Sequence, residues 1–500
     1  MRDGTSDETG KEQARARGST NANGSWSEPR SAITPTSDSE RTAVLVVACA
    51  AAFLTPFMGS ALNLAIPTIG AEMHASAVTL NWVVTAFLVA SAAFLLPFGR
   101  TGDLFGRKRV FIAGMLASAA AATACGLAHS IAWLVALRVL HGIGAAMGFA
   151  TSVAILTSVF PAARRGRVFG ISTASTYTGL SLGPVIGGTL TQHLGWRSIF
   201  FIAGAVALAL AVVALLAVRG EWRGGRGARF DGLGATLYAV SVALLMAGIS
   251  TLRTFPASRF CALAGAMGVV AFVLRELRSS SPILDVRLFS NVTFAFSNLA
   301  ALINYSATFA VSFLLSLYLQ SVRGLPPQSA GFILLAQPLV MALLSPLAGH
   351  LSDRIEPRLV ASLGMAVTSV GLALFALLTP STALAAVVAE LMLVGLGFAL
   401  FSSPNTNAVM SSVEHHHYGI GSATLGTMRL VGQALSMSLA GLIFASYMGR
   451  AGISRETAPL LLASIHTAFA ISAVLCALGV LASAARGRVN RGAQPISPRE

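Results

Sequence analysis

The chain is built almost entirely from apolar runs of about twenty residues, separated by short breaks that contain glycine, proline or charged residues. Each run is long enough to be a transmembrane helix, because a helix crosses the bilayer core with roughly 20 apolar residues. Apolar residues make up 55% of the 500 residues and charged residues only 11%, whereas soluble domains carry roughly 25% charged residues. This composition excludes a soluble enzyme, a secreted disulfide scaffold and a nucleic-acid-binding module.

Fourteen runs are predicted to cross the membrane, which makes the chain an all-α integral membrane protein. They lie at about 43–69, 80–99, 110–128, 131–157, 168–191, 199–218, 233–252, 259–274, 295–319, 328–349, 359–379, 384–406, 419–447 and 464–484. The residues before them are rich in Ser, Thr and Gly and carry nearly balanced charge, which predicts a disordered tail rather than a signal peptide.

The basic residues are distributed unevenly between the two sides of the predicted membrane. With a cytoplasmic amino terminus, the cytoplasmic segments hold 26 of the 34 Lys and Arg residues and the outer loops hold 6. Cytoplasmic loops are enriched in Lys and Arg, so the net charge of +15 indicates topology rather than nucleic-acid binding. Both termini are therefore predicted to be cytoplasmic, with Trp82, Trp133 and Trp196 at the outer interface.

An internal repeat divides the chain into two halves. Gly99 and Asp103 follow the second run, and Gly349 and Asp353 follow the tenth with the same spacing, 250 residues later. Parallel repeats with a substrate path between them are common in transporters. The predicted organisation is a cytoplasmic tail (1–42), a six-helix lobe (43–218), a linker with two extra transmembrane helices (219–294), a second six-helix lobe (295–484) and a second cytoplasmic tail (485–500).

The fifth run is the richest in small residues. Its pattern consists of Gly170, Gly179, Gly183, Pro184, Gly187 and Gly188. Positions 175, 179, 183, 187 and 191 recur every four residues and present a nearly bare backbone on one face. Another helix can approach such a face closely, and the proline is expected to bend the helix. The alternative interpretation is a packing face with no role in transport.

The loop after the second run contains a turn and a cluster of charges. Gly99 and Gly106 permit a tight turn, and Asp103 offers an acceptor to helix-end N–H groups or to an arginine. Arg107 and Lys108 also serve as topology-determining charges. The second copy holds Gly349, Asp353 and Arg354.

These patterns resemble the major facilitator superfamily, specifically its 14-helix drug:proton antiporters. The resemblance covers residues 43–484 and implies two lobes that rock about a central cavity, driven by an ion gradient without a nucleotide. The glycine pattern of the fifth run matches the family's antiporter motif, which implies export. The 99–109 loop matches its most widespread motif, except that Leu104 replaces a usual basic residue.

Only three ionisable side chains are assigned to membrane depth as functional candidates: Arg138, Glu390 and Arg429. Arg138 and His141 share a helix face and resemble the family's fourth-helix arginine motif, with His141 where Gln is common. Arg429 with Gln433 resembles the pattern of the equivalent late helix. In the family these helices line the cavity.

The first run departs from the subfamily pattern at one position. Met58 stands where an Asp is usual, so the carboxylate expected to pair with Arg138 is missing. The 250-residue offset places Glu390 close to the symmetric mate of Arg138, and our hypothesis is that Glu390 supplies the proton-exchanging carboxylate. The alternative is that Glu390 only reaches the outer interface. Two cations against one carboxylate also favour anionic or zwitterionic solutes.

Several polar residues within the runs either line the path or form interhelical hydrogen bonds. They are Asn63, Asn298, Asn304, Tyr305, Gln337, Asn405 and Gln433. Asp231 is predicted to be a helix N-cap. The segment 414–417 (Glu-His-His-His) is interpreted as a solvated loop rather than a metal site, and no metal or cofactor is predicted.

The predicted function is secondary active export of drug- or antibiotic-type small organic molecules across the cytoplasmic membrane, by a monomer and in exchange for protons. An uptake permease of the same fold is the main alternative. An integral-membrane transferase is a distant one, because it would need a cluster of catalytic polar residues at the membrane interface.

Overall fold

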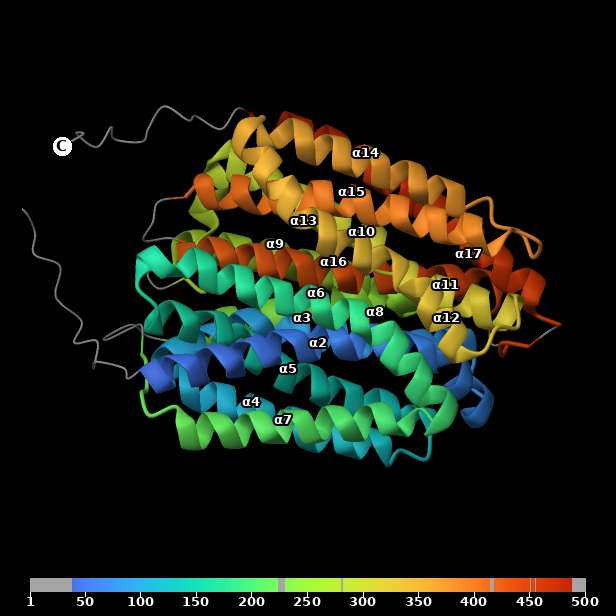
Figure 1. Ribbon diagram of the computed structural model, residues 1–500, viewed down its shortest axis with the longest axis horizontal. Coiled ribbons are helices and arrows are strands. Elements are labelled where there is room, and N and C mark those ends of the chain that lie inside the picture. The colour runs from blue at the N-terminus through green and yellow to red at the C-terminus, as the bar shows by residue number, and fades with distance from the viewer. Residues whose placement is uncertain are drawn as a thin grey trace, which may run out of the picture.

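The computed structural model describes residues 38–223, 230–279, 282–413, 418–449, 451–454 and 456–487. Within these ranges the chain forms helices and no strand, apart from one isolated bridge between Ser76 and Gly452. The long helices run roughly side by side (Figure 1). The all-α prediction is therefore confirmed.

The helices follow the predicted runs. The first half contains α2 (Asp38–Met73), α3 (Ala77–Phe105), α4 (Arg107–Gly126), α5 (Ile131–Val159), α6 (Ala162–His193) and α7 (Arg197–Ala217). Between the halves lie α8 (Gly232–Thr251), α9 (Ser258–Arg278) and the short η1 (Val286–Ser290). The second half contains α10 (Val292–Thr308), α11 (Val311–Leu317), η2 (Tyr318–Val322), α12 (Pro327–Leu334), α13 (Ala336–Arg354), α14 (Pro357–Phe375), α15 (Leu384–Ser411), α16 (Tyr418–Tyr447) and α17 (Ala458–Ala485).

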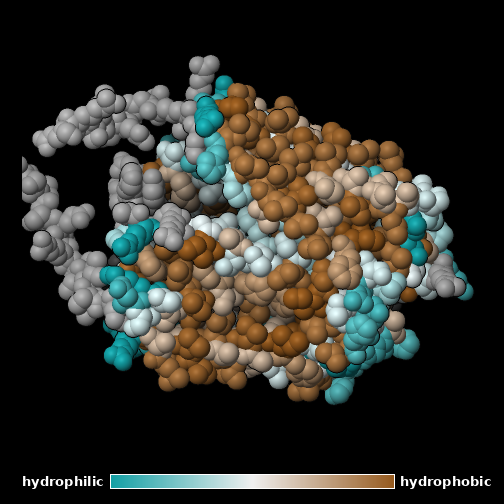
Figure 2. Space-filling view, in the orientation of Figure 1, coloured by the Kyte–Doolittle hydropathy of each residue, from teal (hydrophilic) through white to brown (hydrophobic). Residues whose placement is uncertain are grey.

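Thirteen segments of the described chain are helical, long and apolar enough to cross a membrane. The fourteenth is α6, a 32-residue helix whose glycine, serine and threonine content makes it less apolar than the others. Figure 2 shows the matching surface, with a broad hydrophobic belt between hydrophilic ends.

Two predicted runs are broken helices rather than straight ones. The run 295–319 is interrupted between α10 and α11, where the N–H of Ala310 donates to Ser436 Oγ at 3.1 Å. The run 328–349 breaks at Leu335, because Pro338 has no N–H to donate to the preceding turn. Side chains of neighbouring helices can satisfy backbone groups freed at such breaks, which is what makes them tolerable in a membrane.

Helix starts are fixed by polar caps. Ser76 accepts from Thr79 N–H, Ser130 from Trp133 N–H, Asp231 from Gly234 N–H and Asn291 from Phe294 N–H. Each cap satisfies one of the unpaired N–H groups of a helix start. The prediction that Asp231 is an N-cap is confirmed.

The two halves use the same packing scheme. In the first half α4 packs against α5 and α7, and in the second α14 packs against α15 and α17. The halves meet where α6 contacts α12, α3 contacts α16 and α2 contacts α11. Of the inserted pair, α8 packs against both α3 and α16 as well as α9. The inserted pair therefore contacts both halves through α8.

Two of the tryptophans predicted at the outer interface, Trp133 and Trp196, differ in exposure. Trp133 is 65% exposed near the start of α5. Trp196 is only 1% exposed and donates from its indole nitrogen to Glu72 at 2.7 Å. Trp196 therefore packs against its neighbours at the start of α7, and its place at the outer interface stays a prediction.

Candidate functional site

The helical bundle has two ends. The proximal end is where α2 begins at Asp38, on the left in Figure 1, and the distal end is opposite. The loop between α3 and α4 lies at the proximal end, and the loop between α2 and α3 lies at the distal end.

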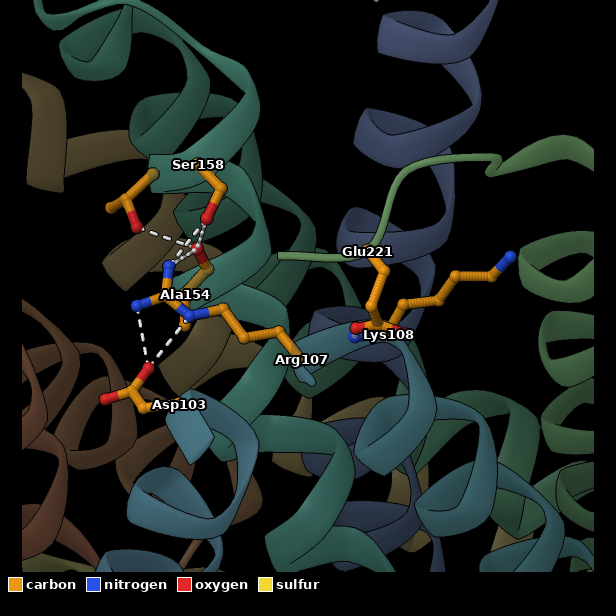
Figure 3. A network of polar contacts seen from close by, with 7 residues as sticks. Asp103, Arg107, Lys108, Ala154, Ser158 and Glu221 are labelled. Carbon is orange, nitrogen blue, oxygen red and sulfur yellow. Dashed lines mark hydrogen bonds and ion pairs between the residues drawn. The ribbon is translucent and has the colours of Figure 1, made fainter. Parts of the chain in front are cut away.

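At the proximal end, Asp103 and Arg107 connect the α3–α4 turn to α5 (Figure 3). Arg107 donates to Asp103 Oδ1 from Nε at 2.9 Å and from Nη2 at 2.7 Å. Its Nη1 donates to the Ala154 carbonyl at 2.9 Å and to Ser158 Oγ at 2.6 Å. Arg107 is thus a bridging residue as well as a topology charge.

Glu221, which sequence reasoning missed, joins the same turn from the segment after α7. Its Oε1 accepts from the Lys108 N–H at 3.0 Å, and its Oε2 lies 3.5 Å from Arg109 Nε. Gly106 has φ +120°, and an added Cβ there would lie 2.5 Å from Glu221 Oε1. The turn therefore requires glycine at Gly106, but Gly99 lies inside α3 and makes no turn, contrary to expectation.

The backbone of this segment also contacts the turn. The Arg107 N–H donates to the Trp222 carbonyl at 3.0 Å, and Lys108 Nζ donates to the Val218 carbonyl. No signal in the sequence links position 221 to position 108. In the second half, Gly349 and Arg354 lie in α13, while the side chain of Asp353 lies outside the described residues.

The glycine face of α6 contacts α2. Added Cβ atoms at Gly179, Gly183 and Gly187 would overlap Phe53, Ser60 and Ala61 of α2, respectively. This is the predicted close approach of another helix.

Gly170 and Gly188 differ from the glycines that face α2. A Cβ at Gly188 would lie 2.5 Å from the carbonyl oxygen of Pro327 in α12, which belongs to the other half. A Cβ at Gly170 would have nothing within 4 Å. The carbonyl of Pro184 closely approaches Gly331, also in α12. The glycine pattern of α6 therefore serves two interfaces, one within the first half and one between the halves.

Several hydrogen bonds join the halves toward the distal end. They are Ser316 Oγ to Asn63 O (2.6 Å), Gln320 Nε2 to Leu64 O (3.1 Å), Gln328 N to Gln192 Oε1 (3.3 Å), His193 with Gln328 (3.4 Å) and Ala77 N to Ala451 O (3.4 Å). Away from that end, Tyr177 of α6 lies 3.1 Å from Ser402 of α15. The two halves are joined distally in this structure.

Arg138 is enclosed within the first half. It is 1% exposed, and its Nε donates to the Val83 carbonyl at 2.9 Å. Its Nη1 lies 2.9 Å from His141 Nδ1, and its guanidinium carbon lies 4.2 Å from the Phe87 ring centre. The structure therefore brings Arg138 and His141 together as expected. Met58 is buried in α2, 2% exposed, and supplies no charge.

Arg429 occupies a different environment, at the interface between the halves. Its guanidinium carbon lies 5.6 Å from the ring centre of Phe149 in α5 and 6.0 Å from that of Tyr305 in α10. Its side chain is half-buried and makes no hydrogen bond or ion pair with another described residue. One turn later in α16, Gln433 is also half-buried. Arg429 is thus held by aromatic rings alone.

Glu390 lies in the second half, away from Arg138. Its Oε2 is buried without a hydrogen-bond partner, and its carbonyl would lie 3.7 Å from a Cβ at Gly371 in α14. The structure shows no ion pair between Glu390 and any described arginine.

The structural register also separates Glu390 from the equivalent of Arg138. Gly114 contacts Gly144 and Gly148 across α4 and α5, whereas Gly364 contacts Gly397 and Phe401 across α14 and α15. The offset for the second helix of each pair is therefore 253 residues rather than 250. It matches Arg138 with Leu391 instead of Glu390. One residue turns the side chain by about 100° around the helix axis.

Some side-chain amide atoms of the candidate residues have hydrogen-bond partners and others do not. Asn405 Nδ2 donates to the Ser297 carbonyl at 3.1 Å, and Asn298 Nδ2 donates to the Phe294 carbonyl at 2.9 Å. Buried amide atoms without a hydrogen-bond partner occur at Asn63, Asn298 and Asn304, and Gln337 is also buried, 7% exposed. Asn405 is thus an interhelical connector.

Arg486 is a second buried, hydrogen-bonded residue that sequence reasoning missed. It lies in the predicted cytoplasmic tail, yet it is 0% exposed and its Nη1 donates to Asn405 Oδ1 at 3.0 Å. In the sequence it looks like one more basic residue after the last run.

No group of three His, Cys, Asp or Glu in the described ranges could hold a metal ion. The Glu-His-His-His segment, 414–417, lies outside those ranges. The four cysteines are free; Cys125 and Cys476 are buried, and Cys49 and Cys261 are half-buried.

Comparison with known proteins places the chain in a family. The sequence model of the Major Facilitator Superfamily matches residues 48–231 and 297–500. The chain is 29% identical over 439 residues to the riboflavin transporter RibZ of Clostridioides difficile (strain 630), covering 88% of this chain and 96% of that protein. It is 31% identical over 429 residues to the cephamycin export protein CmcT of Amycolatopsis lactamdurans, covering 84% and 88%.

The fold also matches solved transporters. A bacterial homolog of the human lysosomal transporter Spinster, in an inward-facing and unoccupied conformation, aligns with a TM-score of 0.64 at 18% identity, covering 90% of this chain and 96% of that one. The peptide transporter POT in complex with sulfate aligns with a TM-score of 0.63 at 15% identity, covering 87% and 93%. The chain, with its two helical halves and membrane-spanning helices, therefore belongs to the Major Facilitator Superfamily and is a multi-pass membrane transporter rather than an enzyme.

Proposed function

We propose that the protein exports small organic molecules of the drug or antibiotic type from the cytoplasm in exchange for protons, as a monomer that alternates access between its two sides. The two lobes are 43–218 and 295–484, joined by the linker 219–294. The proximal end, where α2 begins and α17 ends, faces the cytoplasm, because the segments predicted on that side hold 26 of the 34 basic residues.

The observation that carries the proposal is the double role of α6. Its glycines pack one face against α2, while Gly188 brings α6 against α12 of the other lobe. A helix with two close backbone contacts is well placed to change partners when the lobes rock. With the proximal end cytoplasmic, the distal hydrogen bonds correspond to an inward-facing state ready to take solute from the cytoplasm. The relative whose name describes export of a cephamycin favours this direction.

Glu390 is proposed to carry the exchanged proton. Ionisable groups at membrane depth are expensive and are functional candidates for that reason. This carboxyl group has no ion pair with a described residue, so it can gain or lose a proton without first breaking a salt bridge. Arg138 is not its partner in this structure, since Val83, His141 and Phe87 surround that guanidinium.

The test is solute accumulation in everted membrane vesicles from a host without its own efflux pumps. We expect accumulation of at least one compound from a panel of neutral, anionic and cationic antibiotics and dyes, and its loss on addition of a protonophore. Accumulation only in right-side-out vesicles would instead indicate the uptake permease.

The proton carrier is tested with Glu390→Gln, which we expect to bind solute but to lose accumulation driven by a pH gradient. The matched control is Glu456→Gln, which removes a carboxyl group from an exposed position near the distal end. Full pH-driven transport by Glu390→Gln would overturn the role of Glu390.

A further inference from the structure

We propose that Arg429, Phe149 and Tyr305 form an anchor for a planar aromatic anion, such as an aromatic carboxylate, and that such anions are the preferred substrate class. The inference rests on the proposed function, because it assigns the solute that the transporter carries. It concerns one half-buried site between the lobes, called the Arg429 anchor below.

The charge of Arg429 has no counter-ion in the described structure. The side chain is half removed from water, yet its guanidinium makes no hydrogen bond or ion pair with a described residue. Removing a charge from water without a partner is costly. A guanidinium presents its N–H donors in one plane and binds a carboxylate through two parallel hydrogen bonds. A bound anion would supply the acceptors that the protein does not.

Two buried arginines already have hydrogen-bond partners, which sets the half-buried Arg429 apart. Arg138 donates to the Val83 carbonyl and contacts His141, and Arg486 donates to Asn405 and to the Ser483 carbonyl. These two side chains are 1% and 0% exposed, so neither is open to a solute in this conformation. Of the two cations assigned to membrane depth, Arg429 is the one without a hydrogen-bond partner among the described residues.

The carboxyl group assigned to membrane depth, Glu390, does not form an ion pair with Arg429. Glu390 lies on α15 where its backbone faces Gly371 of α14. The site therefore keeps its positive character and favours an anion over a cation.

The aromatic rings define the rest of the ligand. Phe149 comes from the first lobe and Tyr305 from the second, and both rings face the same guanidinium. The Tyr305 ring is supported by Phe398, with ring centres 5.4 Å apart and an interplanar angle of 76°. Aromatic rings pair in offset or edge-to-face arrangements. A flat ring attached to the anionic group can therefore pack on these side chains while its charge meets Arg429.

The position of the anchor links binding to movement of the lobes. Gly426, one turn before Arg429 in α16, would place a Cβ 3.6 Å from the Phe149 ring. The anchor thus lies where α5 and α16 touch across the interface, and a ligand there contacts both lobes. Rocking of the lobes would change the distance between Phe149 and the other two residues.

The binding test uses 2-naphthoate and its neutral analogue 2-naphthamide, with the full-length protein in lipid nanodiscs and equilibrium dialysis as the readout. We expect the protein to prefer 2-naphthoate by about tenfold or more, as loss of one charge-assisted hydrogen bond predicts. Arg429→Gln should lose this preference, and Arg429→Lys should keep only part of it. Phe149→Leu should weaken both ligands, because it removes a ring and leaves the charge.

The matched control is Arg253→Gln, which removes one positive charge from an exposed loop after α8 and should keep the tenfold preference. Elution volume and Tm of each variant verify folding. Equal binding of the two naphthalene compounds, or an undiminished preference in Arg429→Gln, would overturn the anchor. If Arg429→Gln fails to fold, an unchanged affinity for both ligands in Phe149→Leu overturns it instead.

Transport measurements separate the two proposals. If proteoliposomes export neutral compounds in a pH-dependent way and the preference for 2-naphthoate is absent, the anchor fails and the proposed function stands. If 2-naphthoate binds through Arg429 but no compound crosses under a pH gradient, the anchor stands and the proposed function fails.

Discussion

Glu221 accepts a hydrogen bond from the backbone N–H of Lys108, at a separation of 113 residues in the sequence. The carboxylate therefore acts as an N-cap for α4 although it belongs to the segment that follows α7. A negative charge at a helix start is favourable because it meets both the unpaired N–H groups and the positive end of the helix dipole. Through this contact the start of the linker fixes the turn that carries Asp103 and Arg107.

Replacing Glu221 tests this cap directly. Glu221→Ala should lower the free energy of unfolding by about 1 kcal/mol, the usual loss for a missing cap. Glu221→Gln should lose less, because its side-chain oxygen can still accept from the Lys108 N–H. Thermal unfolding in detergent measures both, and Glu456→Gln serves as the exposed control. Equal Tm values for Glu221→Ala and the wild type would contradict the assignment.

The two ends of the glycine pattern in α6 should respond differently to a methyl group. Gly188→Ala places a Cβ 2.5 Å from the Pro327 carbonyl, so it should disfavour the distally closed state by about 1–3 kcal/mol. Gly170→Ala has nothing within 4 Å to meet and is the matched control. The readout is labelling of a distal Ser316→Cys by an impermeant maleimide, which Gly188→Ala should accelerate. Similar labelling in both alanine variants would refute the distinction.

The partner of Arg138 can be exchanged as well as removed. His141→Gln keeps an acceptor for Arg138 Nη1 and should retain stability and transport. His141→Leu leaves a buried N–H without an acceptor, which costs about 1–3 kcal/mol. We expect it to lower Tm and transport together. A His141→Leu protein as stable and active as His141→Gln would show that the contact is dispensable.

The contact between Asp231 and Arg275 should make the stability of the protein depend on pH. The Arg275 guanidinium donates two hydrogen bonds to this carboxylate, and together with the Gly234 N–H it holds the pKa of Asp231 below its ordinary value of 3.8. A lowered folded-state pKa means that the contribution to stability is complete above the unfolded pKa. It is lost as pH falls through the lower, folded-state pKa.

The variant for this prediction is Asp231→Asn. Its Tm should lie below that of the wild type by a constant amount above about pH 5, and the gap should narrow in more acidic buffer. The loss should be less than about 1 kcal/mol, because Asn can still accept from the Gly234 N–H and because Arg275 is 39% exposed, so water screens the lost ion pair. Asp38→Asn, at a carboxylate that is 96% exposed, is the control. A Tm difference between the wild type and Asp231→Asn that widened toward low pH would contradict the lowered pKa of Asp231.

Local sequence pattern predicted the helices well because crossing a bilayer imposes length and apolarity on each segment separately. The same is true of the α6 face and of the Arg138–His141 pair, which lie within single helices. Contacts that depend on where distant segments meet were not predictable. Glu221 and Arg486 carry no local signature, and each gains its role from a partner more than 80 residues away.

The register between the two halves of the repeat also limited what the sequence could predict about the site. Gly114 and Gly364 obey the 250-residue offset, but the connection into α15 is longer than the one into α5, which changes the offset to 253. A fixed offset of 250 residues therefore places the equivalent of Arg138 beside Glu390, whereas the structure matches Arg138 with Leu391. One residue is enough to turn Glu390 out of the position of its assumed mate.

The enclosure of Arg138 by a peptide carbonyl, an imidazole and a phenyl ring has an electrical consequence. With Met58 in place of an acid, no described carboxylate pairs with that cation, and we expect it to stay a fixed charge during turnover. In the proposed exchange, the charge moved per cycle is then set by the cargo and the returning proton. One monovalent anion leaving as one proton enters transfers two positive charges inward, worth about 4.6 kcal/mol at a membrane potential of about 100 mV. Voltage would then drive such an exchange even between compartments of equal acidity.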